Sequence, residues 1–494
     1  MTDGIPYGSR LTELADRLGD ETAVVFVATD GREEHISWRA LDERANQTAR
    51  LLAERGLGQD GLLVIAFPNC LEHVYITFGA WKVGASVLGL RGDLPAWERE
   101  RVLPLANPTL IAADWDDVDG VVTLADVRSS VALDGSPLDS VGIPPTTGLA
   151  ATSGSTGTPK IIVRTVPGIY FDDDGSLTTA AAGNAMGVTY LVVSPLYHNN
   201  GALLCCPMLL RENRVVLMER FDAAQAVDLI ERHRVNQSLM VPTMLQRIAR
   251  LDGIGDRDLS SLERVIYCSA SLPEWAARAW LELIPPDRFI FAYGGSEQIG
   301  QAMCSGVEWL EHPGTSGLPS ECEMLILDAD RRPLPPGEVG DIYLRLLRPE
   351  QPFEYVGVPT PEPILDGYRT YGDMGYLDDD GFLYVVDRRH DLIISGGANI
   401  FPAEVEAALS EHADLVDAVV IGMPDPDWGQ RVHAIVQPRD PGNPPSDDEL
   451  RDHCRALLAG YKVPKGFELI DEMPRTTAGK VNRSRLITER VPTA

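Results

Sequence analysis

The sequence predicts a layered α/β fold, with a large N-terminal domain of largely parallel sheets, a small β-rich subdomain and a small α+β C-terminal domain. Three observations support this prediction. At 494 residues the chain is too long for one ordinary hydrophobic core. Short apolar runs alternate with segments of helical periodicity through most of the chain. After about residue 320, shorter strands and tight turns replace that alternation.

Strands of the N-terminal domain are predicted from five short apolar runs, at residues 62–67, 190–195, 215–218, 238–242 and 264–269. Between them, residues 222–233 carry apolar side chains at helical spacing. Strands that alternate with helices in this way favour parallel sheets.

The β-rich subdomain is predicted from residues 326–345, where Pro-Gly and Asp-rich turns interrupt β-prone runs. The last part of the chain has strands and a helix of its own, at 417–423, 431–438 and 447–458. We therefore expect an N-terminal domain over residues 1–387 and a C-terminal domain over residues 388–494, with the boundary near His390.

Composition and charge exclude several classes of protein. The chain has 73 acidic against 43 basic residues, a formal net charge of -30, which repels nucleic acid and anionic membranes. No apolar stretch is long enough to span a bilayer and the N-terminus has no secretory pattern, so we expect a cytoplasmic protein without membrane insertion. The seven cysteines are scattered, which indicates neither a disulfide framework nor a zinc site.

The sharpest motif is TSGSTGTPK, from Thr152 to Lys160. Glycines let backbone N–H groups converge on an anion, hydroxyls add donors and lysine supplies a positive charge. The motif is not the GxxxxGK[ST] loop of P-loop NTPases, because its lysine follows a proline and no Ser or Thr succeeds it. The residues predicted to contact phosphate are Thr152, Ser153, Gly154, Ser155, Thr156, Gly157 and Lys160.

This motif resembles the phosphate loop of the adenylate-forming superfamily, which includes acyl-CoA synthetases, luciferases and peptide-synthetase adenylation domains. The resemblance continues in order to the C-terminus and covers nearly the whole chain. It implies ATP or AMP, Mg²⁺ and coenzyme A as ligands, and a C-terminal domain that is mobile. Within the superfamily the chain looks similar to ligases of bulky acids, such as bile-acid CoA ligases.

A second motif, YGGSEQ at residues 293–298, follows an apolar strand, so Glu297 is expected at the strand's carboxyl end, where open α/β sheets bind ligands. By resemblance, Tyr293 and Gly294 lie against the nucleotide base, Ser296 contacts phosphate and Glu297 holds Mg²⁺. Further along the chain, Asp373 and Arg388 resemble the pair that binds the ribose hydroxyls.

The C-terminal domain contributes the remaining catalytic residues by resemblance. Lys480, in a Gly-Lys turn, resembles the catalytic lysine that bridges the carboxylate and phosphate charges. His390 stands at the expected hinge, where the superfamily usually has Asp or Lys. Gly396 and Gly397 resemble the loop that lines the pantetheine tunnel, and are equally consistent with an ordinary turn. In the N-terminal domain, His198 resembles the gate between acyl pocket and tunnel.

The acyl pocket is expected around Tyr197, Val241, Ser269, Ala270, Gly294 and Gly295. The stretch CSAS, residues 268–271, stands where a glycine-rich turn is usual. The expected ligand is a small-molecule carboxylic acid, either polycyclic or long, whose acyl group passes to coenzyme A.

The sequence therefore predicts an acyl-CoA synthetase that works through an acyl-adenylate, and it is compatible with a homodimer. Three alternatives remain open. In the first, the acceptor thiol belongs to a carrier protein instead of coenzyme A. In the second, only thioester formation survives, because Tyr371, Ser296 and His390 depart from the usual pattern. In the third, the chain is a non-catalytic nucleotide-binding regulator.

Overall fold

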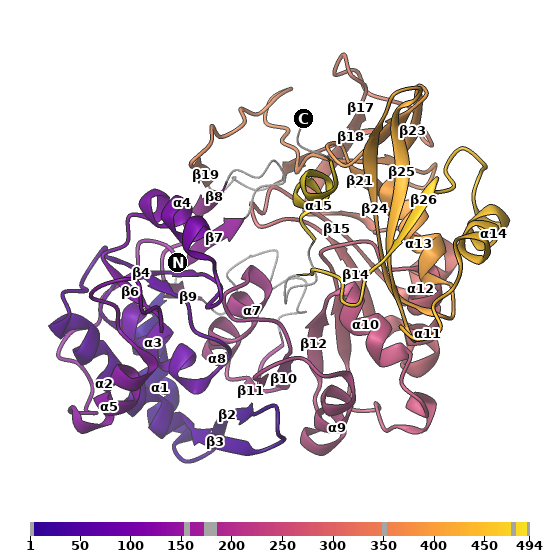
Figure 1. The fold of residues 1–494 in the computed structure, drawn as a ribbon. Coiled ribbons are helices and arrows are strands. Elements are labelled where there is room, and N and C mark those ends of the chain that lie inside the picture. The colour runs from indigo at the N-terminus through magenta and orange to yellow at the C-terminus, as the bar shows by residue number, and fades with distance from the viewer. Residues whose placement is uncertain (1–3, 153–158, 172–184, 348–352, 476–480, 492–494) are drawn as a thin grey trace.

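The computed structural model describes residues 4–152, 159–171, 185–347, 353–475 and 481–491 (Figure 1). The chain forms a large N-terminal part that ends with strand β21 (Leu383–Arg388) and a smaller C-terminal part that begins with β22 (Ile393–Ser395). Among the described residues, no helix is both long and apolar enough to cross a membrane. The seven cysteines are all free thiols.

A nine-stranded sheet forms the centre of the N-terminal part. Its strands from β14 to β2 run parallel. At the edges, β15 and β3 run antiparallel to them, and β16 pairs antiparallel with β15. In spatial order the strands are β16 (Leu318–Ser320), β15 (Gln301–Ser305), β14 (Phe289–Tyr293), β13 (Arg264–Tyr267), β12 (Gln237–Met240), β10 (Thr189–Val192), β11 (Arg214–Met218), β2 (Thr22–Val27) and β3 (Glu33–Ser37).

Amphipathic helices bury their apolar sides against these sheets. In the helix of residues 223–233, Asp222 caps the N-terminus by accepting a hydrogen bond from the Gln225 backbone, and Val227 and Ile230 enter the core. The helices of the N-terminal part are α1 (Tyr7–Leu18), α2 (Trp38–Glu54), α3 (Leu71–Lys82), α4 (Ala96–Ala106), α5 (Leu124–Ser129), α7 (Asn199–Leu204), α8 (Cys206–Leu210), α9 (Ala223–His233), α10 (Pro242–Ala249), α11 (Glu274–Leu283) and α12 (Gly306–Glu311).

Smaller sheets complete the N-terminal part. One is parallel, with β4 (Leu62–Ile65) between β5 (Ser86–Gly89) and β6 (Leu110–Ala112). Two are antiparallel: β19 (Phe353–Val356), β8 (Lys160–Arg164) and β7 (Gly148–Thr152) in one, and β17 (Cys322–Leu327), β18 (Gly340–Leu346), β20 (Asp373–Leu377) and β21 in the other. A short ribbon pairs β1 (Ile5–Pro6) with β9 (Ile169–Tyr170).

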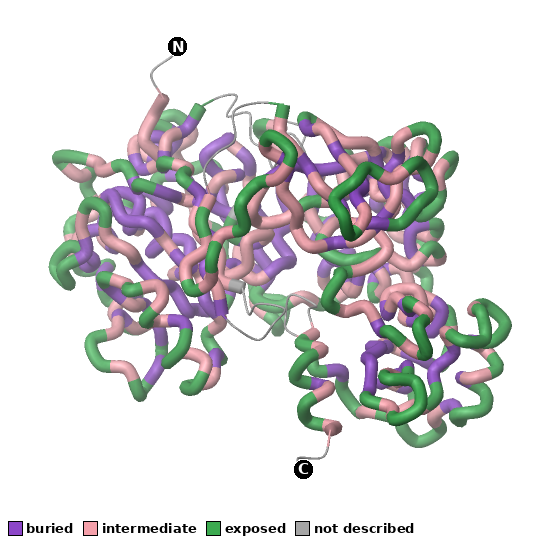
Figure 2. The backbone as a smooth tube through the Cα atoms, turned by 90° about the horizontal axis from the view of Figure 1, so that it is seen from above, coloured by how far each residue is buried: buried purple, intermediate pink, exposed green. Residues whose placement is uncertain are grey.

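The C-terminal part has its own sheet and its own hydrophobic core, seen in Figure 2 as a separate group of buried segments. Its elements are β22, β23 (Ala398–Ile400), α13 (Pro402–Ser410), β24 (Leu415–Asp425), β25 (Gly429–Pro438), α14 (Asp447–Leu457), β26 (Gly466–Leu469) and α15 (Arg483–Arg490). The α/β class and its two parts confirm the fold predicted from the sequence, and the predicted strands and helices form within a few residues of their expected limits.

Direct contacts hold the C-terminal part against the side of the large sheet that carries α10 and α11 (Figure 1). Arg250 donates hydrogen bonds to the carbonyl oxygens of Ser410, at 2.8 Å, and Val416, at 3.3 Å. Trp275 donates from its indole to the Ser410 hydroxyl at 3.3 Å. The Arg250 guanidinium also lies 4.4 Å from the centre of the Trp275 ring, so these two side chains form one contact surface.

Candidate functional site

A cavity of about 1070 Å³ lies between the large sheet and the C-terminal part. Its walls include the carboxyl ends of β12, β13 and β14, the edge at which open α/β sheets bind ligands. Thirteen of the residues predicted for the site line this cavity: Lys160, His198, Val241, Ser269, Ala270, Tyr293, Gly294, Gly295, Ser296, Glu297, Asp373, Arg388 and His390. The structure thus brings together segments that are far apart in the sequence.

Some predicted residues lie elsewhere. Tyr197 is not among the described residues that line the cavity. Its backbone packs against β5, where a Cβ at Gly89 would lie 2.6 Å from the Tyr197 Cα. Thr152 ends β7 opposite Lys160. The predictions for Ser153, Gly154, Ser155, Thr156, Gly157 and Lys480 lie outside the described residues. On either side of residues 476–480, Arg475 and Val481 line the cavity.

Gly396 and Gly397 form the turn between β22 and β23, and neither is among the described residues that line the cavity. Their φ angles are +57° and +83°, a pair of left-handed positions that a two-residue hairpin turn requires. A Cβ at Gly396 would lie 2.3 Å from the Trp428 ring. In this arrangement of the two parts they act as turn glycines, and their role in a thiol tunnel stays a prediction.

Lys160 and Glu297 form an ion pair inside the cavity, with 3.5 Å between Nζ and Oε1. Lys160 begins β8, and Glu297 lies in the loop that follows β14. Burial lowers the pKa of Lys160, and the charge of Glu297 opposes that shift. An ammonium and a carboxylate held side by side are suited to bind phosphate oxygens and a divalent cation, respectively.

Tyr293, Asp373 and Arg388 form a second polar group in the cavity. The Tyr293 hydroxyl donates to Asp373 Oδ2 at 3.0 Å, and Arg388 Nε lies 3.4 Å from Asp373 Oδ1. Burial raises the pKa of Asp373, while Arg388 opposes that shift. Burial, together with the Asp373 charge, also raises the pKa of Tyr293, so its hydroxyl stays protonated and donates. This group offers an aromatic ring for a base and a carboxylate that can accept from two hydroxyls.

Tyr371 braces the loop that carries Glu297. Its hydroxyl accepts a hydrogen bond from the Ile299 backbone at 3.0 Å and donates to the Gly300 carbonyl at 2.9 Å. A Cβ at Gly295 would lie 2.4 Å from the Tyr371 ring, so the tyrosine fills the space beneath a glycine. The superfamily that the chain resembles usually has Thr where Tyr371 stands, and the longer tyrosine gives the loop a support that threonine cannot supply.

The side of the cavity where the acyl pocket is expected combines apolar and polar walls. Its apolar lining includes Phe221, Leu239, Val241, Leu251 and Leu272. Ser269 has a φ of +86°, the left-handed conformation that favours glycine, and its hydroxyl lies 3.1 Å from the Asn200 amide nitrogen, which donates to it. The CSAS stretch thus keeps a backbone suited to glycine, although serine occupies the position.

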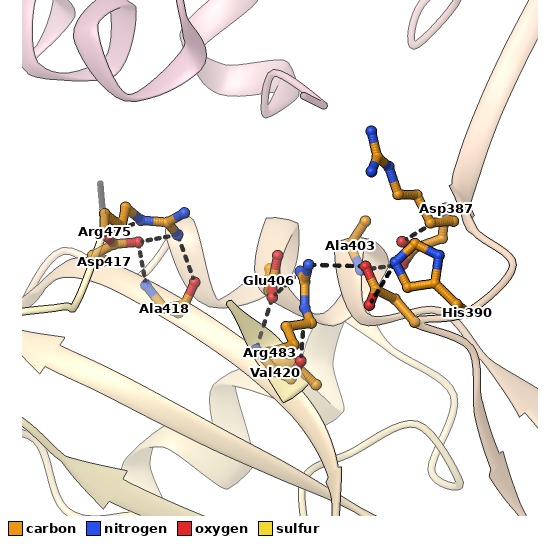
Figure 3. A network of polar contacts seen from close by, with 11 residues as sticks. Asp387, His390, Ala403, Glu406, Asp417, Ala418, Val420, Arg475 and Arg483 are labelled. Carbon is orange, nitrogen blue, oxygen red and sulfur yellow. Dashed lines mark hydrogen bonds and ion pairs between the residues drawn. The ribbon is translucent and has the colours of Figure 1, made fainter. Parts of the chain in front are cut away.

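Figure 3 shows the polar network at the connection between the two parts. Asp387, near the end of β21, accepts a hydrogen bond from the Ala403 backbone at 2.9 Å, in the first turn of α13. Arg483 contacts Glu406 at 2.7 Å and Asp391 at 3.2 Å. His390 Nε2 lies 3.4 Å from Asp391, and burial lowers the pKa of His390. The predicted hinge therefore carries a mostly neutral histidine beside fixed ion pairs.

The chain offers a single carboxylate, Glu297, at the expected metal position. Among the described residues, no group of three or more His, Cys, Asp or Glu side chains is arranged to hold a metal ion. Mg²⁺ usually keeps several waters and takes one or two carboxylates together with substrate phosphates. Glu297 therefore fits as the protein's ligand to a phosphate-bound Mg²⁺, but not as part of a complete metal site.

Tyr355 contacts two of the predicted site residues and was not predicted from the sequence. Its hydroxyl donates to Glu297 Oε1 at 2.6 Å, and its ring lies beneath the Lys160 ammonium. The residue stands on β19, 58 positions from Glu297, so no local motif or spacing signals the contact. Arg483 was likewise missed, although it lies in the basic stretch around residue 480.

Comparison with known proteins identifies the family of the chain. The sequence profile of the AMP-binding enzymes matches residues 11–346, and that of the AMP-binding enzyme C-terminal domain matches residues 404–480. The first match alone spans more than half of the chain. Both profiles fall on the parts of the structure that enclose the cavity.

Individual relatives cover nearly the whole chain. The feruloyl-CoA synthase of an Amycolatopsis species is 32% identical over 462 residues, which is 90% of this chain and 92% of the relative. A fatty acid–[acyl-carrier-protein] ligase of Streptomyces coeruleorubidus is 31% identical and covers 94% of this chain and 93% of its own length. The o-succinylbenzoate CoA synthetase of Bacillus subtilis, solved with its acyl-adenylate intermediate, superposes with a TM-score of 0.80 at 26% identity, covering 98% of both chains.

These relatives correct one expectation. The likeness predicted from the sequence was to bile-acid CoA ligases, whereas the chain is similar to ligases named for o-succinylbenzoate and ferulate. The bile-acid likeness rested on three short stretches, YHNNG (197–201), CSAS (268–271) and ISGGANI (394–400), whereas the relatives match over nine tenths of the chain.

The strained backbone at Ser269 leads to a stability prediction. Replacing Ser269 by glycine removes the cost of a left-handed conformation, and we expect the free energy of unfolding to rise by about 1 kcal/mol. Denaturant unfolding measures the change. Ser271→Gly, two residues along at an exposed position without positive φ, is the matched control and should be neutral or destabilising. A lower stability for Ser269→Gly than for the wild type would contradict the assignment of strain.

The buried carboxyl of Asp387 leads to a prediction about pH. Burial raises its pKa to about 6 from an ordinary 3.8, so between pH 4 and 6 the folded protein holds a proton that the unfolded chain releases. The free energy of unfolding should therefore fall as the pH rises through that window, by up to about 3 kcal/mol from this group.

Asp387→Asn keeps a neutral acceptor for the Ala403 N–H and should remove this part of the pH dependence. Urea unfolding at about pH 4.5 and about pH 6.5 tests the expectation, with exposed Asp379→Asn as the control. An unchanged difference between the two pH values in Asp387→Asn would show that Asp387 is not its source.

Proposed function

The chain belongs to the AMP-binding enzyme family and is an AMP-forming acid–CoA ligase, and we propose that its substrate is an aromatic or otherwise bulky carboxylic acid. One observation carries the proposal: Lys160, Glu297, Asp373 and Arg388 line a single cavity of about 1070 Å³ that continues into an apolar wall. A cavity of that size exceeds the needs of a nucleotide alone. The names of the relatives, for ferulate and o-succinylbenzoate, point to the same class of acid.

We propose that the nucleotide binds across the carboxyl edge of the large sheet. Tyr293 would lie against the base, Asp373 would accept hydrogen bonds from the ribose hydroxyls, and Lys160 would contact the phosphates. Glu297 would hold a phosphate-bound Mg²⁺, whose chemistry is to offset negative charge on the departing pyrophosphate. Each assignment is supported by the resemblance and by the distances within the cavity.

In the first half-reaction, a carboxylate oxygen of the acid attacks the α-phosphorus of ATP. The bond between the α-phosphorus and the bridging oxygen breaks, and pyrophosphate leaves. Two anions must approach each other for this step, so the enzyme's main task is to align them and offset their charge. We assign that task to Lys160 and, by resemblance, to Lys480, in a chain whose net charge of -30 otherwise opposes it.

In the second half-reaction, the sulfur of the thiol attacks the acyl carbonyl carbon, the bond to the phosphate oxygen breaks, and AMP leaves. His198 lines the cavity near the acyl side and is the proposed gate to the thiol. Gly396 and Gly397 lie outside the cavity in this arrangement, so a tunnel built from them requires the C-terminal part to turn about His390. That turn would break the contacts of Arg250 and Trp275 with Ser410.

A carrier-protein thiol is the second candidate acceptor. It is favoured by one relative, the fatty acid–[acyl-carrier-protein] ligase, which matches 94% of the chain. Free coenzyme A and a phosphopantetheine carrier present the same thiol. Formation of free acyl-CoA in the assay below would favour coenzyme A, and pyrophosphate release without acyl-CoA would favour the carrier.

The assay incubates the protein with ATP, Mg²⁺ and a panel of aromatic, polycyclic and long-chain acids, with and without coenzyme A. Mass spectrometry detects the products, and we expect pyrophosphate and acyl-CoA with at least one aromatic or bulky acid. Glu297→Gln should lower pyrophosphate release by about 100-fold, because an uncharged amide cannot hold the metal in the same way. Glu354→Gln, an exposed residue on β19, is the matched control and should retain full activity.

Lys480→Ala separates the half-reactions. It should abolish pyrophosphate release while leaving thioester formation from a supplied acyl-adenylate largely intact. An active Glu297→Gln variant would contradict the role given to that carboxylate. If no acid causes pyrophosphate release but thioester forms from a supplied acyl-adenylate, the chain performs only thioester formation, and the proposal of a two-step ligase is overturned.

A further inference from the structure

We propose that Tyr355 is a positioning residue for adenylation, which fixes Glu297 and Lys160 in the geometry that receives the metal-bound triphosphate. The inference rests on the proposed function and adds to it a residue that neither the motifs nor the resemblance singled out. It comes from three contacts around one aromatic ring.

Strand pairing places Tyr355 beside Lys160. Strand β19 runs antiparallel to β8, with Tyr355 opposite Ile162, and Lys160 lies two residues from Ile162 on the same face of the sheet. Diagonal neighbours of this kind are within reach of long and aromatic side chains. The Lys160 ammonium accordingly lies 3.6 Å from the centre of the Tyr355 ring, a cation–π contact.

The same side chain holds Glu297. The Tyr355 hydroxyl donates to Glu297 Oε1 at 2.6 Å, a short hydrogen bond to a charged acceptor. Lys160 Nζ lies 3.5 Å from the same oxygen. Burial and the charge of Glu297 raise the pKa of Tyr355, so its hydroxyl remains a donor at physiological pH. One ring thus restrains both charged groups.

The choice of oxygen has a chemical consequence. Both contacts engage Oε1, so Oε2 is the oxygen that neither Tyr355 nor Lys160 occupies. A phosphate-bound cation can take Oε2 without breaking the hydrogen bond to Tyr355, and Lys160 can turn to the phosphates while its stem stays against the ring. Preorganisation of this kind lowers the cost of ordering side chains when ligand binds.

A contact between tyrosine and glutamate is not by itself a sign of function, and the chain contains a close comparison. Tyr368 donates to Glu323 at 2.6 Å in the same part of the molecule. Neither Glu323 nor Tyr368 is among the described residues that line the cavity, whereas Glu297, the partner of Tyr355, is one of them. Tyr368→Phe therefore removes the same kind of hydrogen bond at a position without catalytic groups, and serves as the matched control.

The test compares Tyr355→Phe with Tyr368→Phe. We expect Tyr355→Phe to lower kcat/KM for ATP in pyrophosphate release roughly tenfold, as the loss of one hydrogen bond to a charged group implies, and to raise the Mg²⁺ concentration needed for half-maximal rate. Thioester formation from a supplied acyl-adenylate should stay at the wild-type rate. The rise in Tm caused by ATP and Mg²⁺ should shrink, while the Tm of the free protein stays close to that of Tyr368→Phe.

Several outcomes would overturn the inference. One is a Tyr355→Phe variant whose kcat/KM for ATP and ATP-induced rise in Tm equal those of Tyr368→Phe. Another is an equal loss of rate in both half-reactions, which would indicate a purely structural tyrosine. A double-mutant cycle with Glu297→Gln gives a second measurement: the effect of Tyr355→Phe on the ATP-induced rise in Tm should largely vanish in the Glu297→Gln background. A wild-type protein that releases no pyrophosphate with any acid would instead overturn the proposed function. The rise in Tm caused by ATP and Mg²⁺ would still test whether Tyr355 positions Glu297 and Lys160.

Discussion

The site depends on one constraint: a chain with a net charge of -30 must hold a triphosphate next to a carboxylate. The structure meets it by concentrating cations in one cavity, where Lys160, Arg388, Arg475 and Arg483 all contribute to the lining. Each of these cations is already paired with a carboxylate, as Lys160 is with Glu297. An incoming phosphate therefore exchanges one anionic partner for another, and no bare charge has to be kept buried in the free protein.

Few polar contacts join the two parts of the chain among the described residues. Asp387 is hydrogen-bonded to the first turn of α13, and Arg250 and Trp275 reach Ser410 at its other end. Hydrogen bonds of this kind are each worth about 1 kcal/mol, so the observed arrangement is held by a few weak interactions. Each part has its own hydrophobic core, which a rotation about the connection would leave intact. The proposed turn of the C-terminal part between the two half-reactions requires this separation.

Sequence patterns predicted the features that depend on local chemistry. Apolar runs located β10 to β13, and glycine-rich motifs located Lys160 and the loop of Glu297. Features that depend on distant contacts were not predictable: the hydrogen bond of Tyr355 to Glu297, the support of that loop by Tyr371, and the left-handed backbone of Ser269. Tyr197 is not among the described residues that line the cavity although its neighbour His198 is, and a sequence motif does not specify which of two adjacent residues reaches a cavity. The bile-acid likeness was wrong because it rested on three short stretches, YHNNG, CSAS and ISGGANI, and the shape of an acyl pocket depends on side chains from many parts of the chain.

The central claim is that the acid attacks the α-phosphorus of ATP, and the fate of the acid's own oxygen tests it most directly. The acid found active in the panel is labelled with ¹⁸O in its carboxylate and incubated with the protein, ATP, Mg²⁺ and coenzyme A. The account predicts that one labelled oxygen appears in AMP, because the bond formed in adenylation is the bond that stays with phosphorus when the thiol attacks. Label in inorganic phosphate, or in neither product, would contradict an acyl-adenylate and the account built on it.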